Sequence, residues 1–379
     1  MKNENSVCFV SAINNILDIP DADNIELAVV NGWFCIVKKG SHSIGDLVVC
    51  ATTDAVIPLE ISEKLGVTNY LRSKERVRTI KLRGVYSECL LMPIDLIPKN
   101  KREYGEDLMD VLKIYKYEPP ARLITLSSGK KRKYYENPNF YIYYKFPNFK
   151  NVPNIFDEYD YVEITRKIHG TNARYGIVKK SKLSLWDKIK KFFGFNLGWG
   201  EYEFVVGSHN VEKGSDTQGF YDTNVWYDIE KKYDIKNKLW NLVKKNISIK
   251  GNDTSIGSGF IIYGEIYGKG IQKNYEYGLD DIQLCIFDVE LNKKYFNLTS
   301  AEFVVNDYLK LPYVEVLYKG LYSEEVKNKF VFNNFINNTK VPHEGVVIKA
   351  VDGNRSKVAK VINPDYLIYS EKNNVGDSH

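Results

Sequence analysis

The stretch Lys167-Ile168-His169-Gly170-Thr171-Asn172 places a lysine, a small turn and a polar residue directly behind a run of alternating apolar and polar residues. That run, Tyr159 to Thr165, predicts a half-buried β-strand, and Gly170 permits a tight turn close to a ligand. Lys167 is therefore expected at the end of a strand. An amine at such a place is a nucleophile only in its neutral form, which burial and neighbouring cations favour.

The motif resembles the nucleotide-binding motif of the covalent nucleotidyltransferase superfamily, which comprises DNA ligases, RNA ligases and mRNA capping enzymes. It is most similar to that of ATP-dependent RNA ligases of the second phage T4 type and their relatives with an N-terminal OB module. These ligases carry a histidine where His169 stands, whereas DNA ligases and capping enzymes usually carry aspartate. The resemblance implies that Lys167 attacks ATP, and that the ATP-binding residues of this segment are Arg166, Ile168, His169, Gly170 and Asn172.

Two further segments follow in the family's order. The strand-like run from Phe260 to Gly268 resembles the third motif, in which Glu265 would accept hydrogen bonds from the ribose hydroxyls. The run from Ile282 to Val289 resembles the next motif, in which Phe287 would stack on the purine and the carboxylate beside it would support the site. An aromatic residue in an apolar strand is more often part of the core, so only the order of the motifs favours stacking.

The last two motifs carry the cations. The run from His343 to Lys349 matches the fourth motif, in which Glu344 would hold a divalent metal. Lys349, at the other end of that strand, would reach the ATP phosphate that Lys167 attacks if the strand curves over the pocket. In the final motif Lys360 is the better match for a phosphate-binding lysine. Many relatives have a second lysine two places later, where this chain has Ile362, so either Lys357 substitutes or one phosphate contact is missing.

Two positions depart from the pattern of the related ligases. His209, in the run from Phe204 to Asn210, stands where many of them place an arginine on the phosphate or ribose, and a histidine is only partly charged at neutral pH. Arg166 stands where many carry glutamate, so it adds a cation beside Lys167.

The implied chemistry is that of a three-step ligase with Lys167, Lys349 and Lys360 as catalytic residues. Lys167 takes AMP from ATP, the AMP passes to a 5′-phosphate of RNA, and a 3′-hydroxyl then displaces it. Mg²⁺ suits this reaction because it binds phosphate oxygens and retains waters, and the resemblance suggests that Mn²⁺ can replace it.

The first hundred residues contain short β segments and turns with no helical period, which suggests a small OB-like barrel. The run from Arg76 to Gly84 resembles part of an N-terminal module found in one branch of nick-sealing RNA ligases. In it Arg76, Arg78, Lys81 and Arg83 form a basic edge that is expected to bind RNA phosphates, with a solvated strand face as the alternative.

The sequence therefore predicts an α+β protein in which an N-terminal OB-like β-barrel precedes a nucleotidyltransferase domain of antiparallel sheets flanked by helices. The expected division is an OB-like nucleic-acid-binding module at 1–118, a basic linker at 119–145, the nucleotidyltransferase domain at 146–370 and a disordered tail at 371–379. Within the second domain, the stretch from Ser181 to Phe195 has the spacing of a basic amphipathic helix. Packing on the catalytic domain is the first expectation for this helix, RNA contact the second and membrane binding a distant third.

Composition limits the remaining choices. The 379 residues suffice for two domains with their own cores, and the net charge of +5 is modest, so nucleic-acid affinity must come from local basic faces. Five scattered cysteines in no metal-binding spacing predict reduced core thiols in a cytoplasmic protein. We expect no membrane partner, because no apolar stretch has transmembrane length; a monomer is expected, and an end-healing enzyme is a candidate partner.

The resulting hypothesis is an ATP-dependent RNA ligase that joins 3′-hydroxyl and 5′-phosphate RNA ends, most plausibly at nicks in a duplex. Two alternatives remain open. The first is a ligase that acts mainly on DNA or on cleaved tRNA. The second is an RNA-binding protein of the same fold without ligase activity, which the departures at His209 and Ile362 favour.

Overall fold

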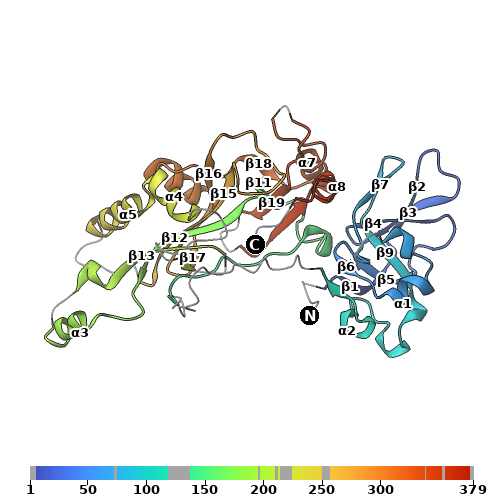
Figure 1. Ribbon diagram of the computed structural model, residues 1–379, viewed down its shortest axis with the longest axis horizontal. Helices are drawn as coiled ribbons and strands as arrows, with labels where there is room; N and C mark the ends of the chain where they lie inside the picture. Colours follow the sequence, from blue (N-terminus) through green and yellow to red (C-terminus); the bar gives the residue numbers. More distant parts are fainter. Residues whose placement is uncertain are drawn as a thin grey trace.

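A computed structural model describes residues 6–71, 75–117, 137–194, 197–209, 212–213, 224–249, 257–337, 339–351 and 355–375. The N-terminal module lies at one end of the long axis, and the sheets of the C-terminal part extend toward the other end (Figure 1). Most of the predicted linker, including its basic stretch, lies outside the described residues.

The N-terminal module is built from small antiparallel sheets. Their strand orders are β1-β5-β9, β2-β3-β4, β7-β8 and β10-β6. The strands are β1 (Cys8–Ala12), β2 (Asn15–Asp18), β3 (Ile25–Val30), β4 (Trp33–Lys38), β5 (Leu47–Thr52), β6 (Ala55–Val56), β7 (Ile80–Leu82), β8 (Val85–Ser87), β9 (Cys89–Pro93) and β10 (Tyr115–Lys116). Helices α1 (Leu59–Lys64) and α2 (Met109–Leu112) and the short helical turns η1 (Thr68–Tyr70), η2 (Ile94–Leu96) and η3 (Lys99–Lys101) connect them.

Alternation of side chains explains the core of this module. In β1, Cys8 and Val10 point inward and pack with Val49 and Ala51 of the paired strand β5. All five cysteines are buried and free, as predicted for reduced core thiols.

The C-terminal part contains two antiparallel sheets. The first has the order β18-β11-β19-β20 and the second the order β14-β13-β12-β15-β16-β17. Their strands are β11 (Tyr161–Lys167), β12 (Thr171–Lys179), β13 (Tyr202–Gly207), β14 (Glu212–Lys213), β15 (Gly259–Gly268), β16 (Ile282–Leu291), β17 (Lys294–Tyr295), β18 (Val316–Leu321), β19 (Gly345–Ala350) and β20 (Val358–Ile362). The turn between β11 and β12 therefore passes the chain from one sheet to the other.

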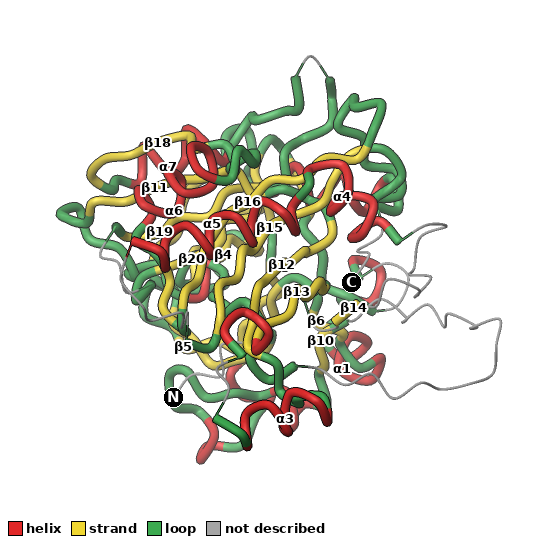
Figure 2. The backbone as a smooth tube through the Cα atoms, turned by 90° about the vertical axis from the view of Figure 1, so that its left-hand side faces the viewer, coloured by secondary structure: helices red, strands yellow, loops and turns green. Residues whose placement is uncertain are grey.

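Helices cover the outer face of the six-stranded sheet (Figure 2). Trp226, Leu239 and Ala301 from three of them enter the same core as Tyr175 of β12. The helices of this part are α3 (Leu185–Phe192), α4 (Val225–Tyr233), α5 (Ile235–Ile249), α6 (Leu298–Phe303), α7 (Glu324–Val331) and α8 (Pro364–Lys372), with the short elements η4 (Phe149–Asn151), η5 (Gly198–Glu201) and η6 (Val304–Tyr308). The α+β architecture predicted from the sequence is confirmed; α8 extends to Lys372, inside the range expected for the tail.

The N-terminal module contacts the C-terminal part through α8 and η4. The Tyr86 hydroxyl donates to Asp365 at 2.7 Å, and Arg78 forms an ion pair with Glu371. On the η4 side, the Trp33 indole donates to Asn151 at 3.1 Å. These contacts fix the module beside the helix that follows β20.

The expectation that the basic amphipathic helix packs on the catalytic domain is wrong. The segment forms helix α3, but its large apolar side chains are exposed, and the helix protrudes at the end of the molecule opposite the N-terminal module (Figure 1). Amphipathic spacing predicts a helix with an apolar face and does not identify what covers that face.

Candidate active site

Lys167 ends β11 beside the start of β19. The register pairs Lys167 with Gly345, and the Lys167 Nζ lies 2.6 Å from the Glu344 Oε1. A Cβ on Gly345 would lie 2.1 Å from the Val361 carbonyl oxygen, and its φ is +151°, so only glycine fits this close approach of the strands. Strand pairing therefore brings together a lysine and a glutamate that are far apart in sequence.

One face of the four-stranded sheet carries most of the predicted catalytic residues. Because side chains alternate and paired residues share a face, Lys167, Thr165 and Glu163 lie on the same face as Lys349 and Lys360. Ile362 pairs with Gly345, which pairs with Lys167, so the place of the second family lysine is in the row of Lys167 and is apolar in this chain.

The turn from Ile168 to Gly170 leads into the second sheet. A Cβ on Gly170 would lie 2.2 Å from the Ile266 carbonyl oxygen, so the turn packs directly against β15. Asn172 follows on β12 and pairs with Glu265, and its Oδ1 is buried without a hydrogen-bond partner. Ile168 is half-buried in the turn.

Glu265 lies close to the charges of the first sheet. Burial raises the pKa of Glu265 to about 8; Lys167 opposes the rise and Glu344 adds to it. Lys167 thus has two carboxyl groups near it, Glu344 in an ion pair and Glu265, whose burial favours the neutral acid.

His169 is buried behind Glu344. Its Nδ1 lies 3.1 Å from the Tyr366 hydroxyl and 3.9 Å from the Glu344 Oε2, and its ring meets that of Tyr275 edge-on at 4.8 Å. Its backbone N–H donates to the Tyr277 hydroxyl at 2.7 Å. These contacts orient the turn and Glu344, which suits a positioning residue.

Phe287 and Lys349 form a second group, away from Lys167. Phe287 is the extra residue where the register of β15 and β16 shifts, and its ring lies 5.0 Å from that of Tyr143. Lys349 pairs with Glu163 of β11. Glu163 precedes Lys167 by four residues, so the backbones of Lys349 and Lys167 are separated by about 13 Å along the strand direction. Its Nζ donates to the Phe287 carbonyl at 2.9 Å and lies 3.2 Å from Asp288.

Asp288 is the centre of this second group. Arg355, which the sequence reasoning missed, donates to its Oδ1 at 2.7 Å and to its Oδ2 at 3.1 Å, and the Tyr143 hydroxyl donates to the Oδ2 at 2.8 Å. Burial alone would raise the pKa of Asp288, but Lys349 and Arg355 hold it below its usual value. The resemblance had implied a supporting role for the carboxylate beside Phe287, but nothing in the sequence identified its partners Arg355 and Tyr143.

The two lysines of the final motif lie in different surroundings. Lys360, on β20, is half-buried, and its backbone N–H donates to the Pro147 carbonyl at 3.0 Å. The ammonium of Lys357 binds Asp160 at 2.7 Å and Asp157 at 3.0 Å, beyond the end of β20 remote from Lys167. The structure therefore places Lys360, and not Lys357, on the face that carries Lys167.

Arg166 and His209 are the two residues that depart from the pattern of the related ligases. Arg166 points to the opposite face of β11 from Lys167, where its Nε lies 3.0 Å from Glu315. His209 is half-buried two residues after β13, and Arg174 fixes the preceding backbone by donating to the Ser208 carbonyl at 2.8 Å.

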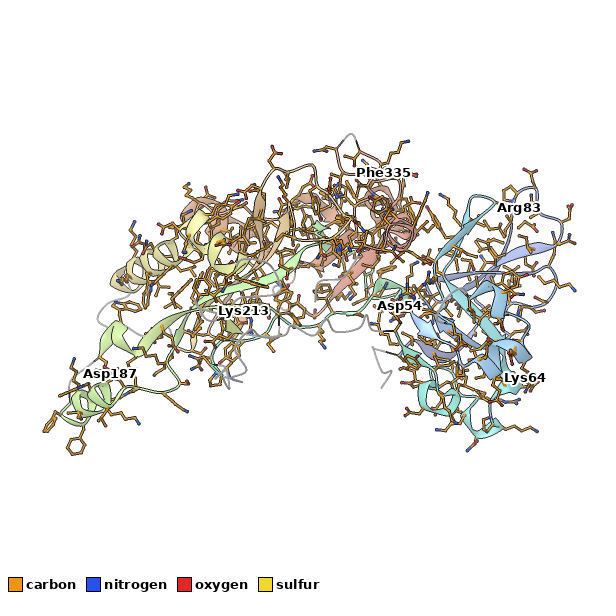
Figure 3. The ribbon with its side chains drawn as sticks, viewed as in Figure 1. Asp54, Lys64, Arg83, Asp187, Lys213 and Phe335 are labelled. Atoms are coloured by element: carbon orange, nitrogen blue, oxygen red, sulfur yellow. The ribbon has the colours of Figure 1, made fainter. Side chains whose placement is uncertain are left out.

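The predicted basic edge of the N-terminal module mostly faces carboxylates. Arg76 lies 3.7 Å from Asp54, Arg78 pairs with Glu371, and Lys81 lies 3.7 Å from Asp365. Arg83 donates to the Asp21 carbonyl and projects from the outer part of the module (Figure 3). The acidic partners on α8 are almost three hundred residues away in the chain, and the local sequence gives no sign of them.

No group of three or more His, Cys, Asp or Glu side chains suited to a metal occurs in the described part of the chain. Glu344 nevertheless has one buried carboxylate oxygen, Oε2, without a hydrogen-bond partner. A hard divalent cation takes oxygen ligands and keeps waters, so this oxygen and a bound phosphate fit such an ion. Nor does any described helix combine the length and apolar character that crossing a bilayer requires.

Comparison with known proteins agrees with this architecture. The family model described as RNA ligase matches residues 160–362, and an OB-fold domain model matches residues 7–94. No curated protein matches the chain.

Solved structures of an RNA ligase from Naegleria gruberi share the fold along nearly the whole chain. The complex with PPi is 22% identical, has a TM-score of 0.69 and covers 97% of this chain and 99% of that chain. A point mutant with ATP and Mn is also 22% identical, with a TM-score of 0.69 and coverage of 96% and 98%. A second mutant with AMP and Mn is 21% identical, with a TM-score of 0.68 and coverage of 96% and 98%. Because the RNA ligase model spans more than half of the sequence, this chain belongs to the RNA ligase family.

Proposed function

We propose that this protein is an ATP-dependent ligase that joins 3′-hydroxyl and 5′-phosphate ends of RNA through a lysyl-AMP intermediate on Lys167. The observation that carries the proposal is the position of Lys167 at a strand end, near the carboxyl group of Glu265 on β15 and in an ion pair with Glu344, the residue before β19. The Naegleria structures support it: ATP and PPi are the reactant and the released product of lysine adenylylation, AMP is the group that is transferred, and Mn is a divalent metal of the kind the reaction needs.

In the first step the Lys167 nitrogen attacks the α-phosphorus of ATP, a P–N bond forms, the bond to pyrophosphate breaks and the amine loses a proton. The ion pair with Glu344 favours the protonated amine, so Lys167 must leave this partner before it attacks. Glu344 would hold the Mg²⁺ or Mn²⁺, which neutralises phosphate charge when bound. Once Glu344 is engaged in that way, Lys167 no longer has the carboxylate that keeps it charged.

The other residues of the site would bind and orient the substrate. Lys360 would contact the ATP phosphates, Glu265 the ribose, and Phe287 the purine. His169 would act through Glu344, which it supports from behind. Lys349 would hold Asp288 and the backbone of Phe287, and so position the stacking residue without touching the α-phosphate.

In the second step a 5′-phosphate oxygen of RNA attacks the AMP phosphorus and the lysine leaves; in the third a 3′-hydroxyl attacks the RNA phosphate and AMP leaves. We propose that the substrate is a nick in duplex RNA, whose ends an end-healing enzyme would supply. The OB module would span 1–118 and the transferase domain 146–370. The protein would act as a monomer in a reducing compartment. RNA contact by Arg78 and Lys81 would require phosphates to displace Glu371 and Asp365.

The test uses α-phosphate-labelled ATP with the wild type, Lys167→Ala and, as a matched control, Lys64→Ala in exposed helix α1. We expect denatured wild type and Lys64→Ala to retain label that added pyrophosphate removes, and Lys167→Ala to retain none. Because the third step does not use the amine, Lys167→Ala should still seal a nick whose 5′ end already carries AMP.

Absence of label on the wild type with either metal would refute ligase activity and favour an RNA-binding protein of this fold. Label together with efficient joining of nicked DNA or cleaved tRNA, but not of nicked RNA, would retain the lysyl-AMP and overturn the proposed substrate.

A further inference from the structure

Helix α3 is an insertion between β12 and β13 and forms the end of the molecule farthest from the N-terminal module (Figures 1 and 3). Its start is capped by Ser184, which accepts a hydrogen bond from the Asp187 backbone N–H at 3.1 Å. Gly194, with a φ of +78°, ends it. The helix is therefore locally well specified, although its apolar side chains lie in no core.

These apolar side chains form one surface. With about 100° between successive residues, Phe192, Leu185, Ile189, Phe193 and Trp186 fall within an arc of about 120°. Their exposed fractions are 86%, 74%, 39%, 70% and 73%, in the same order. Contiguous exposed apolar side chains of this size mark a binding surface.

The charges around the apolar arc are arranged asymmetrically. Lys188 borders one edge of the arc and Lys190 the other, while the single acidic residue, Asp187, lies on the far side of the helix. Lys191, also on the far side, pairs with Glu201 at 2.8 Å and so ties the helix to its own domain. The surface presented outward is thus apolar in the middle and basic at both margins.

This pattern selects among occupants. A second copy would bring the marginal lysines of both helices together, which is repulsive. RNA bases stack on open ring faces, but here the aliphatic Leu185 and Ile189 occupy the middle of the arc, and the Phe192 and Phe193 rings meet edge-on at 5.5 Å. The surface also lies beyond the far end of β12, about 26 Å from the Lys167 end of that strand.

We propose that α3 inserts its apolar arc into the interfacial layer of an anionic lipid bilayer. The five side chains enter the headgroup and acyl boundary, and Lys188 and Lys190 extend along its edges to the lipid phosphates. A short helix suffices because it is the tip of a protrusion, so the aromatic side chains reach the bilayer before the body of the protein does. This inference departs from the expectation of no membrane partner and does not depend on ligase activity.

The test is co-sedimentation of the full chain with vesicles of phosphatidylcholine alone or mixed with phosphatidylserine, without RNA. We expect binding to the anionic vesicles only, weakened about fivefold for each of Lys188→Ala and Lys190→Ala. Phe192→Asp should lower binding at least about tenfold. Matched controls are Tyr70→Asp, an equally exposed aromatic on the N-terminal module, and Lys64→Ala, and both should bind like the wild type.

A circular dichroism spectrum and a thermal unfolding midpoint equal to those of the wild type show that the Phe192→Asp variant is folded, whether or not the protein is a ligase. No binding of the wild type to anionic vesicles, or equal loss in Tyr70→Asp, would overturn the proposal. Weaker binding of Phe192→Asp to RNA in the absence of lipid, with vesicle binding unchanged, would overturn it in favour of a nucleic-acid surface.

Discussion

Replacing Asp288 tests whether one carboxylate joins the two sheets of the ligase domain. Asp288, on β16, is fully buried and binds Lys349 of β19 and Arg355 beyond it, and it also accepts a hydrogen bond from Tyr143. Asp288→Ala removes the carboxylate from two buried cations, which keep only backbone carbonyls as hydrogen-bond partners among the described residues. Removing one member of a buried ion pair costs about 3–5 kcal/mol, so we expect a loss of that size.

The assays are urea unfolding, which gives the free energy of unfolding, and thermal unfolding, which gives the Tm, both at pH 7 and followed by intrinsic fluorescence. A loss of about 3–5 kcal/mol corresponds to a fall of roughly 6–20 °C in the Tm of a domain of this size. Asp281→Ala is the matched control, since Asp281 forms an exposed pair with Lys232 at 2.8 Å and exposed pairs contribute about 0–1 kcal/mol. In a Lys349→Met background the cost of Asp288→Ala should shrink, because one of the two uncompensated charges is gone.

Lowering the pH should reduce the difference in the free energy of unfolding between the wild type and Asp288→Ala. The folded-state pKa of Asp288 is depressed, so its ionisation stabilises the protein above the unfolded pKa of about 3.9, and this stabilisation disappears as the pH falls through the lower folded value. The gap between wild type and Asp288→Ala should be constant near neutral pH and narrow below about pH 4. A loss at pH 7 no larger than that of Asp281→Ala would refute the reasoning.

Three further predictions concern the site and the domain contact. Gly170→Ala should abolish self-adenylylation because its Cβ would strike the β15 backbone, whereas Gly200→Ala, whose Cβ would meet its nearest neighbour at 3.8 Å, should label normally. Lys357→Ala should keep at least about half of the labelling rate, since its ammonium binds two surface carboxylates; a tenfold loss would return it to the phosphate-binding set. Arg78→Glu should speed hydrogen exchange in α8 by repelling Glu371, and adding Glu371→Arg should restore slow exchange if the ion pair holds the domains together.

The sequence was sufficient to predict antiparallel sheets because the family motifs fall on alternating segments and resemble those of ligase-type domains, but alternation does not determine which strands pair. Lys167 and Glu344 are far apart in the chain, yet each was expected at a strand terminus, and adjacent strands then bring them together. The position of Lys349 was harder to predict. Its distance from Lys167 follows from the register of β11 and β19, which the spacing within one motif does not determine.

Contacts between domains were not accessible from the sequence. Arg76 and Arg78 alternate as in a strand, yet the regular strand begins only at Ile80, and both arginines bind carboxylates. The neighbouring sequence does not distinguish an arginine that binds a phosphate from one that forms an ion pair with a glutamate on a distant helix. Helix α3 presents the same limit, since its spacing predicts an apolar face but not its partner.

The contact between the domains nevertheless reaches the candidate site, because an unbroken series of polar contacts joins the interface to Lys167. Tyr86 of the N-terminal module holds Asp365 in the first turn of α8, and the next residue, Tyr366, lies against the buried ring of His169. His169 in turn faces the same carboxylate, Glu344, that binds Lys167. Docking of the module therefore restrains the start of α8, and through Tyr366 and His169 it restrains Glu344, the carboxylate that releases Lys167 in the proposed first step. The contact between the module and α8 is therefore expected to contribute to the geometry of the proposed first step, because the contacts that position Glu344 begin at this interface.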